Sequence, residues 1–254
     1  MHAPKTNRHA AFTWIEMMVV IVCVVLLALI VVPPPLSRPK AKASRINCGN
    51  NLKNIGLGWR ILGGDDFPWQ PAAIDRTRAT PTNYTTAPGF PLPTDQGVAT
   101  IFSIISNALS VPKFLVCPSD AKRFQLKTNS FAFLMAPAQA PVRDRAISYF
   151  IGTSASENHP GSILGGDRNL AGGPFGADPN TPPSQVALRL PRATATNVAA
   201  MKSAVWTQDI HQGAGNLLLG DGSVQQVTSG LMRDQFRDAA LSTGADLDFV
   251  WPAN

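Results

Sequence analysis

Two residues near the C-terminal end of the chain, His211 and Asp221, have types that could carry acid–base chemistry. They stand in the pattern His-x9-Asp-Gly, with Gly222 directly after the acid. A His/Asp pair needs a nucleophile or a metal to act on, and the sequence contains no Gly-x-Ser-x-Gly, His-Glu-x-x-His, phosphate loop or dinucleotide fingerprint. We therefore predict that the protein is not an enzyme and needs no cofactor. The structural alternative is that His211 bonds to a loop backbone and Asp221 shapes a turn.

The three cysteines are the other candidates for chemistry. Cys23 lies within an apolar run, where a thiol acts as a small hydrophobic group, so Cys48 and Cys117 are the two outside it. A disulfide between these two would close a loop of about 70 residues and would need an oxidising compartment. The alternative is two unrelated buried thiols. Two thiols and dispersed histidines do not supply four zinc ligands, and no carboxylate cluster specifies calcium, so we predict no metal site.

One acid, Glu16, stands directly before an uncharged apolar run, Met17 to Val32. Counted from Trp14 to Val32, an α-helix would reach about 28 Å, close to a bilayer core of about 30 Å. We therefore predict a membrane-spanning helix. An acid within such a helix is a functional candidate, although it could instead reach back to the lipid headgroups.

The residues before this run form a signal. A short basic leader without an acid precedes the sequence Phe-Thr-x-Ile-Glu at 12–16. This pattern resembles the class III signal of type IV pilins and type II secretion pseudopilins, with Ala11 where that family usually has Gly. The resemblance implies that a prepilin peptidase cuts between Ala11 and Phe12 and methylates the new amine. It also implies that Glu16 pairs with the terminal ammonium of a neighbouring subunit during filament assembly.

Further landmarks look like those of a pilin-like subfamily described as carrying a prepilin-processing-associated His-x9-Asp-Gly region. Together with the signal they extend from residue 12 to residue 222, which is most of the chain. They are the Asn-Asn-Leu-Lys after Cys48, Cys-Pro-Ser-Asp at 117–120, Asp-Arg-Asn at 167–169, and the His-x9-Asp-Gly pattern itself at 211–222.

Two observations compete with this interpretation. The small-x-small sequence at 41–43 has the form of a signal-peptidase site, although the apolar run is longer than the about 7–15 residues of a secretory signal. Basic residues from Arg38 to Arg45 would, by the positive-inside rule, place the C-terminal part in the cytoplasm. We favour an exported head, because the pilin-like leader directs export and because an exported head could form the disulfide. The basic residues could then contact lipid headgroups.

Composition and residue spacing indicate an α+β, loop-rich fold, and the resemblance implies that this fold is pilin-like. The 22 prolines and 20 glycines argue against a mostly helical body. Pro33 to Pro35 should end the first helix, and the apolar spacing from Cys48 to Leu62 predicts a second, amphipathic helix that begins near Ala41. Other expected elements are strands at 114–116, 148–152 and 162–166, a hairpin at 216–227 with its turn at 220–222, helices at 98–109 and 229–241, and loops at 65–100 and 172–192.

Three segments follow from these expectations. We predict a leader peptide at 1–11 and a transmembrane and assembly helix at 12–36. The remainder, 37–254, is predicted to be an extracytoplasmic head in which the second helix packs on an antiparallel β-sheet.

The net charge of +6 is unevenly distributed. Residues 61–254 contain fourteen basic and fifteen acidic residues, a balance of −1, so the head is near neutral and we predict no nucleic-acid binding.

From the resemblance we expect a structural subunit of a type IV pilus-like or pseudopilus filament, single-pass in the inner membrane. Its expected partners are a prepilin peptidase, other pilin-like subunits and inner-membrane lipid. The alternative is a membrane-anchored or secreted extracytoplasmic binding protein that forms no filament.

Overall fold

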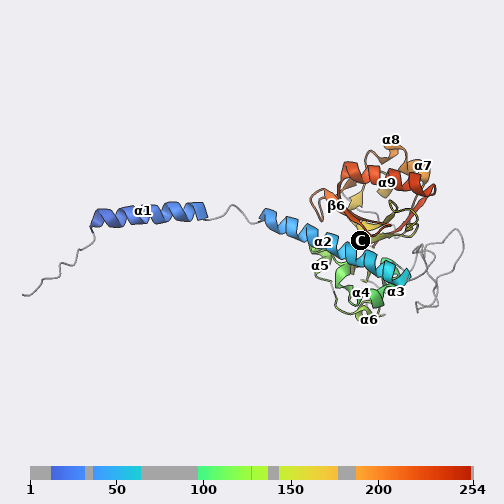
Figure 1. The fold of residues 1–254 in the computed structure, drawn as a ribbon, viewed down its shortest axis with the longest axis horizontal. Helices are drawn as coiled ribbons and strands as arrows, with labels where there is room; N and C mark the ends of the chain where they lie inside the picture. The colour runs from blue at the N-terminus through green and yellow to red at the C-terminus, as the bar shows by residue number, and fades with distance from the viewer. Residues whose placement is uncertain are drawn as a thin grey trace, which may run out of the picture. The chain divides into compact units, whose positions relative to one another are not determined.

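The computed structural model describes residues 13–31, 37–63, 97–126, 128–136, 143–176 and 187–252. The chain divides into two compact units, Met1–Lys40 and Ala41–Asn254, and we call the second unit the head. Figure 1 shows the elements of both units and labels most of the helices among them. The signal residues Ala11 and Phe12, the prolines at 33–35 and most of the predicted loop at 65–100 lie outside the described residues.

The first unit contains the apolar helix α1 (Trp14–Val31). The run contains no Gly or Pro that would interrupt the helix. Its first turn is closed by the Met17 nitrogen, which donates to the Thr13 carbonyl at 3.2 Å.

The prediction of a membrane-spanning helix is wrong. Among the described residues, no helix combines the length and the apolar character needed to cross a membrane. α1 has 18 residues and carries Glu16 in its first turn. At about 1.5 Å per residue, the uncharged part after Glu16 reaches about 22 Å, short of a bilayer core of about 30 Å.

The predicted amphipathic helix is α2 (Ser37–Gly63), which begins earlier than the expected start at Ala41. Pro39 falls in its first turn, where the missing amide donor has no intrahelical partner to lose. As predicted, one stripe of α2 is buried, and its fully covered members are Cys48, Leu52, Ile55 and Trp59.

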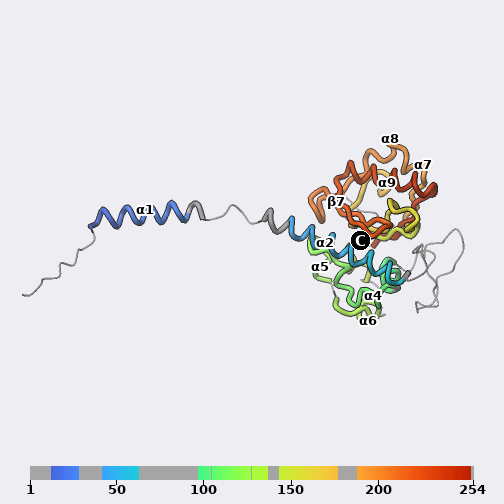
Figure 2. Tube along the Cα trace, in the orientation of Figure 1, coloured from blue at the N-terminus to red at the C-terminus, as the bar shows by residue number. Residues whose placement is uncertain are grey.

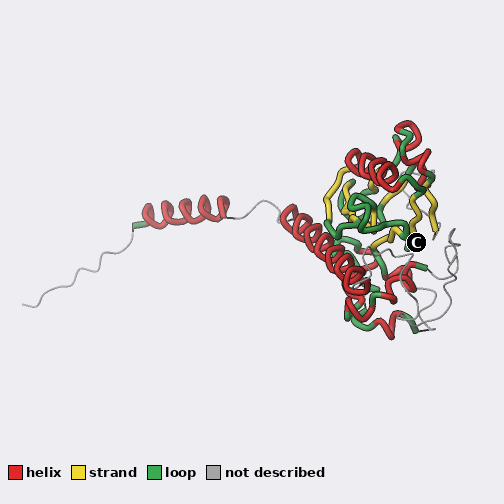
Figure 3. The backbone as a smooth tube through the Cα atoms, turned by 45° about the vertical axis from the view of Figure 1, so that its right-hand side comes forward, coloured by secondary structure: helices red, strands yellow, loops and turns green. Residues whose placement is uncertain are grey.

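A six-stranded sheet with strand order β4-β8-β1-β2-β6-β7 forms the centre of the head. Every neighbouring pair runs antiparallel, which confirms the predicted antiparallel sheet (Figure 3, yellow strands). The strands are β1 (Tyr149–Gly152), β2 (Ile163–Asp167), β4 (Ala187–Leu190), β6 (Ala214–Leu219), β7 (Val224–Thr228) and β8 (Leu247–Val250).

One face of this sheet is covered by α2 and a group of short helices (Figures 1 and 3). The core on this side joins Leu52 and Trp59 of α2 to Ile151, Leu164 and Leu218 of the sheet. The short helices are α3 (Val98–Ile104), α4 (Ser106–Leu109), η1 (Pro112–Leu115), α5 (Ala121–Phe124), α6 (Phe131–Leu134) and η3 (Asp144–Ala146).

The opposite face is covered by α9 (Ser229–Thr243), with α7 (Arg192–Ala195) and α8 (Val198–Met201) beside it (Figure 2). Phe236 of α9 packs among aromatic side chains of the sheet and the C-terminal segment, where Trp251 stacks on Phe150 with ring centroids 4.2 Å apart. Smaller elements on the chain between β2 and α9 are β3 (Leu170–Ala171), η4 (Gly173–Phe175) and β5 (Val205–Trp206), with β3 and β5 paired as a two-stranded sheet.

Several local predictions were wrong. The expected strand at 114–116 is the 3₁₀ helix η1, which Pro112 initiates because its fixed φ suits a first helical position. The expected helix at 98–109 is divided into α3 and α4 at Ile105. The expected loop at 172–192 contains η4 and strand β4.

Candidate functional site

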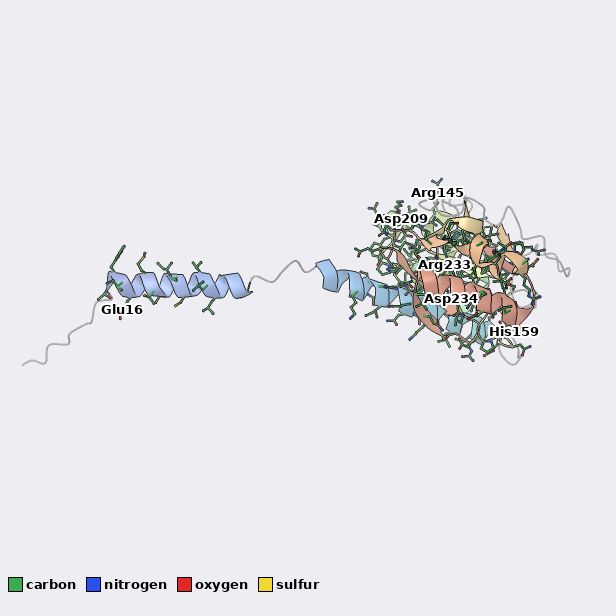
Figure 4. All side chains as sticks on the ribbon, turned by 90° about the horizontal axis from the view of Figure 1, so that it is seen from above. Glu16, Arg145, His159, Asp209, Arg233 and Asp234 are labelled. Atoms are coloured by element: carbon green, nitrogen blue, oxygen red, sulfur yellow. A yellow bond between two sulfur atoms is a disulfide. The ribbon has the colours of Figure 1, made fainter. Side chains whose placement is uncertain are left out.

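Glu16 and Thr13 share three hydrogen bonds at the start of α1, where Figure 4 labels Glu16. Thr13 donates to Glu16 Oε2 from its backbone nitrogen and from its hydroxyl, both at 3.1 Å, and the Glu16 nitrogen donates to Thr13 Oγ1 at 3.4 Å. This arrangement is a capping box, which satisfies free N–H groups at a helix N-terminus. The acid therefore has a folding role within its own chain, which the sequence interpretation did not include.

The apolar side chains of α1 are exposed around the whole helix. From Trp14 to Leu27 the large apolar side chains are between 47% (Met18) and 78% (Trp14) exposed. Cys23 lies among them as a free, exposed thiol. An exposed apolar surface of this extent marks a site of association.

The predicted disulfide is present and joins Cys48 of α2 to Cys117, which follows η1. The two Cα atoms are 5.0 Å apart and the residues are 69 positions apart in the sequence. Both cysteines are fully buried. The bond therefore ties α2 to the segment of short helices on the same face of the sheet.

His211 lies directly beside this disulfide. Its Nε2 atom is 3.5 Å from Cys117 Sγ, 3.3 Å from Asp167 Oδ2 and 3.3 Å from Asn216 Nδ2. The side chains of His211 and Asp167 are 1% and 0% exposed. The acid that meets His211 is therefore Asp167, at the end of β2, and not Asp221.

Asn216 of β6 holds Asp167 in place with two hydrogen bonds. Its backbone nitrogen donates to Asp167 Oδ2 at 2.7 Å, and its side-chain Nδ2 donates to the same oxygen at 2.9 Å. The other carboxylate oxygen of Asp167 is buried without a hydrogen-bond partner among the described residues. An ionised carboxylate at this position is costly, because burial removes water from it and nothing compensates the second oxygen.

Burial changes the ionisation of both groups. It raises the pKa of Asp167 to about 7, against the opposing effect of the Asn216 hydrogen bonds and the Arg45 charge. Burial also lowers the pKa of His211 to about 4, and the positive charge of Arg45 adds to that shift. At neutral pH His211 is therefore uncharged, with a single proton on one of its two ring nitrogens.

A buried ion pair lies near this group. Asp120 accepts from Arg168 at two points, Oδ2 from Nε at 2.8 Å and Oδ1 from Nη2 at 3.0 Å, and both side chains are buried. The Ser148 hydroxyl also donates to Asp120, at 3.0 Å. Arg123 donates from Nη1 to the Asp144 and Ile147 carbonyls at 2.8 and 2.6 Å, and burial and the Arg168 charge lower its pKa to about 9.

Tyr149 links the sheet to α2 next to the disulfide. Its hydroxyl donates to the Cys48 carbonyl at 3.4 Å and accepts from Asn51 Nδ2 at 3.4 Å. Asn51 also donates to the Val116 carbonyl at 3.0 Å. Burial raises the pKa of Tyr149 well above its usual range, so the hydroxyl keeps its proton as a donor.

Asp221 and Gly222 lie in the turn between β6 and β7, as predicted. Asp221 Oδ1 accepts from the Ser223 nitrogen at 2.8 Å, and Gly222 has a φ of 80°, a left-handed conformation that favours glycine. The spacing His-x9-Asp-Gly thus follows from the length of β6, which has the buried His211 before it and this turn after it.

The group can order the head, but the geometry offers it little means to act on a substrate. Donor atoms of Cys48, Cys117 and His211 lie within 4.8 Å of one another. In this oxidised form the two sulfurs are bonded to each other, so they are not thiolate ligands. His211 and Asp167 are closed off from solvent. The contacts of His211 are with the side chains of Cys117, Asp167 and Asn216, whereas the structural interpretation of the sequence expected a bond to a loop backbone.

Sequence reasoning found the segments of this group but not its pairings. The landmarks at 117–120 and 167–169 contain Asp120, Asp167 and Arg168, yet neither spacing nor periodicity shows that Asp120 pairs with Arg168 or that Asp167 meets His211. Asn216 was seen only as the start of a strand. An acidic residue at the end of a buried strand, as Asp167 is in β2, was the available signal.

Comparisons with known proteins give no match: no family model fits the chain, no curated protein is similar to it, and no solved structure resembles it.

Proposed function

We propose that the protein is a pilin-like structural subunit that is processed before Phe12 and assembles into a filament through α1. The observation that carries this proposal is the uncovered apolar surface of α1, which begins at Trp14, within the signal-like sequence at 12–16. Burying one large aliphatic side chain gains about 1.5–3 kcal/mol. A helix with such side chains on all sides therefore gains most when similar helices surround it, as they do in the centre of a filament.

The disulfide supports an extracytoplasmic position for the head. Cys48 and Cys117 are bonded, and disulfides persist in oxidising compartments and are rare in the cytosol. The head would then lie in the periplasm or at the cell surface, with α1 as the assembly element.

The buried polar side chains around His211 and the nearby buried ion pair support a structural role for the head. Their charged members pair with one another or with backbone carbonyls inside the core, including the Asp120–Arg168 ion pair. Because these side chains bond inside the core, they fix α2, the short helices and the sheet in a single arrangement. That suits a subunit whose surface must repeat identically along a filament.

Processing is the step that tests this function first. The full chain is produced in a bacterium with and without a prepilin peptidase, and its intact mass and N-terminal sequence are determined. We expect a mature chain that begins with N-methylated Phe12 only when the peptidase is present. Ala11→Gly should accelerate the cleavage, since the family usually has Gly there. A retained Met1, or Ser44 as the first residue, would reject the proposal.

A further inference from the structure

Two helices of the head each present an exposed face outside the contacts described so far. On α2, exposed residues recur at spacings of four, three, four and four, which places them on one side of the helix. We call them the α2 face: Ile46, Asn50, Lys53, Leu57 and Ile61.

The α2 face is apolar and basic. Ile46, Leu57 and Ile61 are 48%, 56% and 58% exposed. Lys53 lies within the face, Lys42 and Arg60 are exposed beside it, and α2 contains no acidic residue. Arg60 is paired with Glu157, so Lys42 and Lys53 supply most of the positive charge of this surface.

On α9 a second set recurs at spacings of three, four and three. We call it the α9 face: Leu231, Asp234, Asp238 and Leu241. The two leucines are 57% and 52% exposed, and the side chains of the two aspartates are 55% and 61% exposed. Figure 4 labels Asp234 on this helix. Arg237 pairs with both aspartates, which leaves the face with one net negative charge.

The two faces lie on opposite sides of the sheet. Successive residues of a strand point to opposite faces, and in β6 the side chain of Leu218 belongs to the core under α2 whereas Leu217 and Leu219 belong to the core under α9. One molecule therefore cannot bring its own α2 face and α9 face together. Two copies stacked head to tail can.

We propose that the α2 face of one copy docks on the α9 face of the next copy of this chain. Both faces are apolar strips of exposed Leu or Ile, and their charges are opposite in sign, so a second copy offers both the apolar area and the charge complement that each face lacks. Because the two surfaces differ, the contact is heterologous and leaves a free face at each end for another copy. This inference rests on the proposed filament function and names the contact between heads that α1 alone does not supply.

Photo-crosslinking in the full, assembled chain tests this contact. Leu57 is replaced by benzoylphenylalanine in one isotope-labelled pool and mixed with an unlabelled pool before assembly, and the crosslinked peptides are identified by mass spectrometry. We expect mixed-isotope peptides that join Leu57 to residues 229–243. The reciprocal replacement at Leu231 should link to α2. Phe133 of α6 is an exposed apolar residue outside both faces (55%) and serves as the matched control, which should not link to either face.

The outcomes separate this inference from the function on which it rests. If α1-dependent assembly occurs but Leu57 links to α2 of another copy, to a different protein, to lipid or to nothing, the docking is overturned and the filament stands. If the full chain does not assemble at all, both are overturned. As a second measurement, Lys53→Glu should weaken association of the chain about fivefold and Lys53→Glu with Asp238→Lys should restore it; no loss, or no rescue, also overturns the docking.

Discussion

His211 Nε2 and Asp167 Oδ2 lie 3.3 Å apart in the core of the head, and burial moves their pKa values in opposite directions. The folded Asp167 has a pKa of about 7, above its ordinary value, so its contribution to stability grows as the pH falls from about 7 towards 4. The folded His211 has a pKa of about 4, below its ordinary value, so its contribution is lost as the pH falls from 6.5 towards 4. In this window the two contributions oppose each other.

Single substitutions should therefore give opposite pH dependences. Relative to the wild type, Asp167→Asn should lose stability as the pH falls from about 7 to 4, and His211→Gln should gain it as the pH falls from about 6.5 to 4. Each slope should reach at most about 1.4 kcal/mol per pH unit. Thermal unfolding of the two variants and the wild type across this range measures the slopes, and parallel curves would contradict the assignment.

The Asp120–Arg168 ion pair should contribute far more to stability than a similar pair at the surface. Arg168→Ala removes both Arg168 hydrogen bonds from the buried Asp120 carboxylate, which keeps the Ser148 hydroxyl and Arg123 Nε at 3.8 Å, and should destabilise the head by roughly 3–5 kcal/mol. The matched control is Arg189, which bonds Asp248 at two points, 2.7 and 3.1 Å, but is 51% exposed. Arg189→Ala should cost less than about 1 kcal/mol. Equal losses in denaturant unfolding would show that burial is not what distinguishes the pairs.

Removal of the disulfide should lower the stability of the head without changing its fold. Cys48 and Cys117 are 69 positions apart, and a loop of this size is worth about 4 kcal/mol in the chain-entropy model. We expect Cys48→Ser with Cys117→Ser to unfold at a markedly lower denaturant concentration. The wild type should fall to the same value in a thiol reductant, whereas the double variant should not respond to it. A reductant-insensitive wild type would mean that the bond does not form.

Periodicity and turn chemistry predicted much of this fold from the sequence. The buried stripe of α2 follows from apolar spacing alone, and the β6–β7 turn follows from the need for a positive φ at Gly222. Segments without such a pattern were misjudged. Phe114 to Val116 looks like a strand by composition, yet Pro112 starts a 3₁₀ helix there. Length and hydropathy of the sequence also overestimated α1, since no described helix is long and apolar enough to cross a membrane.

The candidate site was predictable as a set of segments and not as a set of contacts. Local pattern marks His211, but its partner Asp167 comes from a strand 44 positions earlier (211 − 167 = 44), and only the pairing of β2 with β6 brings them together. The same holds for Asp120 and Arg168, which lie on different elements. The capping box at Glu16 was within reach of the sequence, since Thr13 and Glu16 have the Thr-x-x-Glu spacing of that motif.

The charge of Glu16 gives the most direct measurement of the central claim, which is assembly through α1. Glu16→Gln keeps an oxygen that can accept from Thr13 and so keeps the capping box, but it removes the charge that the terminal ammonium of a neighbour would need. Thr13→Val is the matched control, because it removes the hydroxyl of the cap and leaves the charge in place. Each full chain is produced with a prepilin peptidase and an assembly ATPase, and filaments are quantified by electron microscopy and by crosslinking between subunits. We expect Glu16→Gln to lose filaments while its head stays as protease-resistant as that of the wild type. Thr13→Val should still form filaments. Filaments of Glu16→Gln at the wild-type level would contradict this expectation, because the acid would then serve only to cap the helix.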